Sequence, residues 1–115
     1  MSPAKLLFAA VFLSIAVLAF MPSYKPLPDI VSMSDILNHF AAFFTLYLLH
    51  LAAYPAVTWR LRSAFFLGYG ILIEAVQAFL PTRQSSASDV AVDAAAILAA
   101  VLLHRLFRRF ATVYA

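Results

Sequence analysis

The sequence predicts an all-α integral membrane bundle of about four transmembrane helices, with both termini on the cytoplasmic side. Of the 115 residues, 65% are hydrophobic and only 11% are charged, whereas soluble domains carry about 25% charged residues. The sequence has four apolar stretches, at about 6–21, 36–57, 64–80 and 90–103, and each is bounded by charged residues, proline or serine. Since a span takes about 20 residues, we expect one transmembrane domain over residues 1–115.

The first apolar stretch has two interpretations. Lys5 precedes it and Pro22 follows it, a pattern that a secretory signal peptide shares. The segment VLAF at 17–20 offers no A-x-A-like cleavage site. We therefore expect a retained anchor helix. Cysteine is absent, which excludes a disulfide framework and thiolate chemistry.

The positive residues predict the orientation. The net charge is +3, and the cations flank apolar runs, which suits membrane orientation rather than nucleic-acid binding. If both termini are cytoplasmic, two of the eight Lys and Arg residues lie outside, Lys25 and Arg83. The other six lie inside, which follows the positive-inside rule: Lys5, Arg60, Arg62, Arg105, Arg108 and Arg109.

In this topology, polar residues of the last three spans converge on one layer near the outer membrane surface. They occupy the start of the second span, the end of the third and the start of the fourth, and most are spaced three or four apart on one helix face. We expect a functional polar cluster here, made of Asp35, His39, Glu74, Gln77, Arg83, Asp89 and Asp93.

Three of these residues are the strongest candidates. His39, Glu74 and Asp93 lie a turn or more inside apolar runs, where helix capping does not explain them. A charge at the centre of a transmembrane helix costs roughly 2.5–3.5 kcal/mol on insertion scales, and such residues mark sites or pathways. A proton pathway is disfavoured, because residues 40–49 of the second span are uncharged, as is the third span before Glu74.

The other four have structural alternatives. Asp35 and Asp89 begin helices and can act as caps. Gln77 can hold helices together through an interhelical hydrogen bond. Arg83 can extend to lipid headgroups, pair with an acidic residue or bind an anionic group such as a phosphate.

Three blocks of the sequence resemble the VanZ-like membrane proteins. They are DILNHF at 35–40, GILIEAVQAFLPTR at 70–83 and SASDVAVD at 86–93. The middle block, with its I-E-x-x-Q-x-F-x-P-x-R pattern, is the most specific. Ile36 stands where the family tends to have Lys, and Asp93 where Asn is usual. The resemblance implies a protein of the bacterial cytoplasmic (inner) membrane and a link to susceptibility to the lipoglycopeptide teicoplanin.

These observations leave three functional hypotheses. The first is a cell-envelope protein whose outer polar site binds a lipid-linked or anionic ligand, with Arg83 meeting the anion. The second is an outer-leaflet hydrolase or transferase that uses His39 with a carboxylate, or a divalent metal held by His39, Glu74 and an Asp. The third is a structural or accessory subunit, in which the polar layer packs helices or recruits a partner. Self-association remains open.

Overall fold

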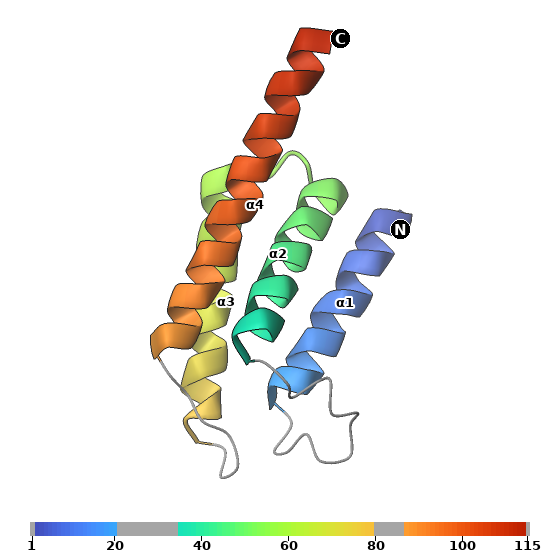
Figure 1. Cartoon of the computed structure of the whole chain (residues 1–115). Coiled ribbons are helices and arrows are strands. Elements are labelled where there is room, and N and C mark those ends of the chain that lie inside the picture. The colour runs from blue at the N-terminus through green and yellow to red at the C-terminus, as the bar shows by residue number, and fades with distance from the viewer. Residues whose placement is uncertain (1, 21–34, 80–86, 115) are drawn as a thin grey trace.

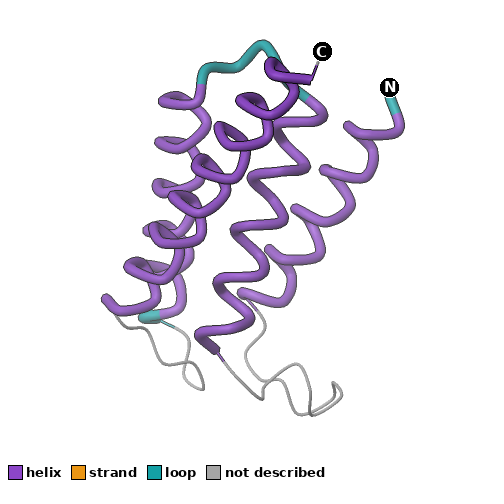
Figure 2. The backbone as a smooth tube through the Cα atoms, turned by 45° about the horizontal axis from the view of Figure 1, so that its top comes forward, coloured by secondary structure: helices purple, strands orange, loops and turns teal. Residues whose placement is uncertain are grey.

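The computed structural model describes residues 2–20, 35–79 and 87–114, which form four α-helices. They are α1 (Pro3–Phe20), α2 (Asp35–Ala53), α3 (Trp59–Gln77) and α4 (Ala87–Tyr114). The helices lie side by side and alternate in direction (Figure 1), an arrangement that Figure 2 shows from a second angle. The predicted all-α fold is confirmed.

The two ends of the bundle carry opposite charge. One end holds the start of α1, the α2–α3 turn and the end of α4 (Figure 1), together with all six Lys and Arg residues of the described ranges. The other end holds the start of α2, the end of α3 and the start of α4, with all four acidic residues of those ranges. We call these the basic end and the acidic end.

The starts of α1 and α3 follow from ordinary capping chemistry. The Ser2 hydroxyl accepts a hydrogen bond from the Lys5 amide at 3.2 Å, and proline suits the first helical position because its missing N–H would have no intrahelical partner. Thr58 caps α3 and accepts from the Leu61 amide at 3.3 Å. These side chains satisfy amides that a helix start leaves free.

The turn between α2 and α3 differs from the predicted one. α2 ends at Ala53, before the predicted boundary at 57, because Pro55 disfavours the helical conformation of the residue ahead of it. α3 then begins at Trp59 rather than at 64. Arg60 and Arg62, which were expected in the connection, lie in the first turn of α3.

α4 is longer than the predicted span of 90–103. It runs over 28 residues, or about 42 Å at 1.5 Å per residue, against a bilayer hydrocarbon core of about 30 Å. Its last part extends past the other helices at the basic end (Figure 1). The arginines there are exposed, and no proline or glycine in this segment interrupts the helix.

α2 and α4 form the most extensive helix pair in the bundle. Ala96 and Ala100 on α4 are fully buried and lie one turn apart. Small side chains at this spacing let two backbones approach closely. The larger members of the core are Phe43, Leu46 and Tyr47 of α2 and Phe66 and Ile73 of α3.

Large apolar side chains also cover the outside of the bundle. α1 exposes Leu6, Leu7, Leu13 and Val17, each by more than half of its surface, and buries only Ala19. Pro3–Phe20 and Asp89–Phe110 are long and apolar enough to cross a membrane, and Leu37–Ala53 is a shorter apolar helix. α3 carries three charged residues, Arg60, Arg62 and Glu74, and is not among these apolar helices.

Candidate functional site at the acidic end

A histidine–aspartate pair joins α2 to α4 at the acidic end. His39 Nδ1 lies 3.3 Å from Asp93 Oδ1. The Asp93 side chain is 1% exposed and that of His39 is 19% exposed, so the pair spans from the interior of the bundle toward its surface. A carboxylate that accepts from Nδ1 orients the imidazole and leaves Nε2 for a ligand or a proton.

The second oxygen of Asp93 points into a space that glycine creates. A Cβ on Gly70 of α3 would lie 2.7 Å from Asp93 Oδ2, closer than nonbonded atoms approach. Gly70 therefore lets the carboxylate enter the interface between α3 and α4. Asp93 Oδ2 is buried and has no hydrogen-bond partner among the described residues, which is unusual for a carboxylate oxygen in a protein interior.

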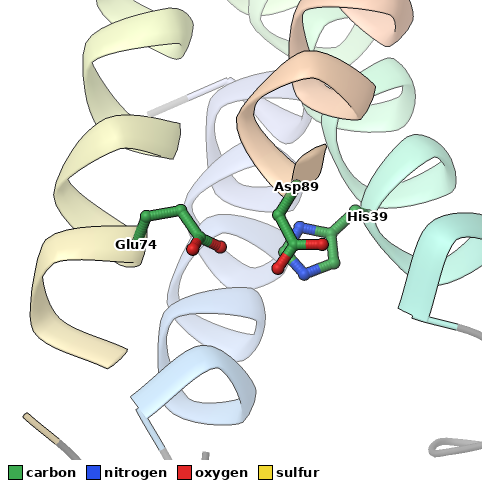
Figure 3. A group of neighbouring side chains, drawn as sticks. All are labelled: His39, Glu74 and Asp89. Carbon is green, nitrogen blue, oxygen red and sulfur yellow. The ribbon is translucent and has the colours of Figure 1, made fainter. Parts of the chain in front are cut away.

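His39 also belongs to a second group, in which three side chains from three helices meet. His39 of α2, Glu74 of α3 and Asp89 of α4 point toward one another (Figure 3), and one ligand atom from each lies within 4.8 Å of the other two. Glu74 Oε1 is buried. Asp89 and Asp93 are one helical turn apart on the same face of α4, so Asp93 lies beneath the group.

Gln77 is placed differently from the rest of the predicted cluster. Its Nε2 donates a buried hydrogen bond of 2.8 Å to the carbonyl oxygen of Ala19. Ala19 is the second-last residue of α1, so the bond ties the end of α3 to the end of α1. The contact matches the structural alternative for Gln77, an interhelical hydrogen bond.

Two predicted cluster members are not placed. Asp35 begins α2, but its side chain lies outside the described residues, and so does all of Arg83. Of the seven residues predicted, the structure brings together His39, Glu74, Asp89 and Asp93.

A buried arginine at the basic end had no signal in the sequence. Arg62 was expected in the connection between the second and third spans on the inner side, yet it is 2% exposed. Its guanidinium donates to Tyr54 O at 2.8 Å, to Val57 O at 2.9 Å and to His50 Nδ1 at 2.9 Å. Arg62 therefore closes the α2–α3 turn by binding two carbonyl oxygens of the turn and the His50 ring of α2.

The donor set at the acidic end suits positive charge or proton transfer. The described residues there supply one imidazole and three carboxylates, and every described Lys and Arg lies at the basic end. Such a set can bind a cation or hold and release a proton. An anionic group would need a cation beside it.

Comparisons of the chain with models of protein families, with curated proteins and with solved structures find no match in any of the three.

Proposed function

We propose that this chain is a VanZ-like integral membrane protein of the bacterial cytoplasmic membrane, which binds the polar headgroup of a lipid-linked ligand at the outer membrane surface. One observation carries the proposal: His39, Glu74 and Asp89 meet over the buried Asp93 at one end of an otherwise apolar bundle. Ionisable side chains inside membrane bundles are costly and mark functional sites.

Support for membrane insertion comes from the outer surface of the helices. A core helix of a soluble protein would be mostly buried. The most apolar stretch of α1 is instead 6% buried, and that of α4 is 28% buried. Exposed apolar area on this scale is typical of a surface that meets lipid. The three blocks that resemble the VanZ-like proteins cover the last three helices.

Support for the orientation comes from the separation of charge. The six described cations gather at the basic end, and the positive-inside rule places such an end in the cytoplasm. Two guanidinium groups lie over the Trp59 ring there, that of Arg60 at 5.4 Å and that of Arg105 at 4.8 Å from its centre. Aromatic and cationic residues together are typical of the headgroup layer. The acidic end then faces outward.

The orientation can be tested with single cysteines, because the chain has none. Ala56 lies in the exposed turn at the basic end, and Phe79 is 88% exposed at the acidic end. In intact cells, a membrane-impermeant thiol reagent should label Phe79→Cys but not Ala56→Cys. Both should react after permeabilisation. Labelling of Ala56→Cys alone in intact cells would place the site in the cytoplasm and refute the outer-surface assignment.

The ligand can be tested by its effect on drug susceptibility and by direct binding. Expression of the protein in a bacterial host should lower susceptibility to teicoplanin, and Glu74→Gln should abolish the effect at equal membrane abundance. The purified protein in nanodiscs should retain a lipid-linked cell-wall precursor that the variant loses. If the wild type and the variant behave alike in both assays, the cluster does not bind this ligand.

The His39–Asp93 contact favours one second candidate, an outer-leaflet hydrolase. An imidazole oriented by a carboxylate is a general-base arrangement. His39 would take a proton from water, the resulting hydroxide would attack an ester or phosphoester, and the His39 imidazolium would return that proton to the leaving oxygen. His39→Asn would then abolish turnover and leave lipid binding measurable, whereas pure binding predicts no turnover in the wild type.

A further inference from the structure

We propose that His39, Glu74 and Asp89 bind one divalent first-row transition-metal ion, with Asp93 as the residue that positions His39. This inference rests on the proposed function for the identity of the ligand. The anionic part of the lipid headgroup would bind to the metal ion. The ion itself would be held by the protein's own residues.

The first argument is the geometry of the three donors. Their ligand atoms lie within 4.8 Å of one another and come from three separate helices (Figure 3). Metal–ligand bonds of about 2.1 Å place the donors of one tetrahedral ion roughly 3.5 Å apart. Closing the group by about 1 Å needs only side-chain rotation, because carboxylate torsions are broad.

The second and independent argument is the buried carboxylate beneath the group. Asp93 is fully buried, contacts His39 Nδ1 through Oδ1, and has an Oδ2 without a hydrogen-bond partner among the described residues. Histidines that ligate metals commonly donate their other ring N–H to a carboxylate, which fixes the ring and raises its basicity. Asp93 holds that position relative to His39.

The third argument is charge. Glu74 and Asp89 supply two carboxyl groups in a layer where the described residues include no Lys or Arg. A divalent cation would neutralise both, and burial of carboxylates is tolerated when they coordinate metals. Without such a cation, the carboxylates of Glu74 on α3 and Asp89 on α4 would repel each other across the end of the bundle.

The types of donor atom limit which metal ions the site can bind. One imidazole and two carboxylates suit manganese, iron or zinc, whereas magnesium and calcium prefer oxygen ligands alone. Three protein ligands leave at least one coordination position free, as in zinc sites that bind a substrate. A phosphate or carboxylate oxygen of the ligand can take this position, which explains how an acidic cluster receives an anion.

The test is metal binding by the purified full-length protein in nanodiscs, without a tag and without any lipid-linked ligand. After stripping and reloading with Zn²⁺ or Mn²⁺, elemental analysis should find about one ion per chain. His39→Gln, Glu74→Gln and Asp89→Asn should each lower affinity more than about 100-fold, and Asp93→Asn about 10- to 100-fold. His104→Gln, at the basic end, is the matched control and should bind like the wild type.

Co²⁺ provides a second readout that does not depend on affinity alone. Its visible absorption bands should show nitrogen and oxygen ligands in the wild type and in His104→Gln, and should change in His39→Gln. Helical content by circular dichroism identifies variants that fail to fold. If His39→Gln is one of them, the conservative Glu74→Gln is compared with His104→Gln in its place. No bound ion in the folded wild type, or equal binding by His39→Gln and His104→Gln, would overturn the inference.

The outcomes separate this inference from the proposed function. One ion per chain without any retention of a lipid-linked precursor would refute the proposed ligand and leave the metal site standing. Retention of the precursor by a protein that binds no metal would refute the metal site and leave the proposed ligand standing.

Discussion

Gly70 of α3 faces the buried carboxylate of Asp93, and a Cβ at position 70 would lie 2.7 Å from Asp93 Oδ2 and 3.4 Å from its Cβ. The same carboxylate contacts His39 on the other side. Asp93 therefore cannot turn away from position 70 without giving up the contact that orients the histidine. A missing side chain on one helix thus sets the position of a charged side chain on another.

Gly70→Ala is expected to lower stability by about 1–3 kcal/mol, because overpacking forces side chains or backbone to shift. It should also weaken metal binding through the displaced Asp93. Thermal unfolding of the purified protein in detergent measures the first effect.

Gly68→Ala is the matched control, since a Cβ there meets nothing within 4 Å. Alanine in place of a mid-helix glycine stabilises by roughly 0.5–1 kcal/mol, so the two variants should shift the melting temperature in opposite directions. Melting-temperature shifts of the same sign and size in both variants would show that a Cβ at position 70 is accommodated without strain against Asp93.

Arg62→Lys is expected to destabilise the bundle by about 1–3 kcal/mol despite keeping the charge. A lysine ammonium cannot reproduce the planar fork that reaches the part-buried Tyr54 O, Val57 O and His50 Nδ1 at once. Loss of such hydrogen bonds costs about this much. Chemical unfolding in detergent provides the measurement.

Arg60→Lys serves as its control, because Arg60 follows Trp59 in the first turn of α3 and its side chain is exposed. Surface substitutions of this kind usually stay within about 0.5 kcal/mol. Equal losses for the two variants would argue against a specific role of Arg62 in closing the turn.

Gln77→Leu and Glu74→Gln should have opposite consequences. Gln77→Leu removes the hydrogen bond to Ala19 O, and such interhelical bonds contribute on average about 0.6 kcal/mol. It should reduce stability slightly and leave metal binding intact. Glu74→Gln should preserve the fold and abolish metal binding. Unfolding curves and metal stoichiometry on the same preparations compare the two, and loss of metal by Gln77→Leu would contradict the assignment of Gln77 as structural.

Trp59, the single tryptophan of the chain, should report the depth of the basic end. It is 45% exposed, and the guanidinium groups of Arg60 and Arg105 lie over its ring. In vesicles, lipids brominated near the glycerol should quench its fluorescence more than lipids brominated near the chain ends. Trp59→Phe gives the background signal. Stronger quenching from the chain ends would move this end of the bundle into the hydrocarbon core.

The sequence alone determined the helical class and the polar composition of the acidic end. Apolar stretches of span length fix helices because a backbone in lipid must satisfy its own hydrogen bonds, and alternating direction then brings the start of one helix beside the end of the next. His39, Glu74 and Asp93 could be assigned to one layer on this basis. Pro55 ends α2 at Ala53, ahead of the predicted boundary at 57.

Only the tertiary structure decided which residue meets which. Spacing along a helix gives the face of a side chain, but the rotation of each helix and the choice of neighbours depend on packing across the whole bundle, which includes the extensive contact between α2 and α4. That packing pairs His39 with Asp93, directs Gln77 to α1 and buries Arg62 in the turn. These contacts join residues 12 to 58 positions apart, and no local pattern encodes a distance of that kind.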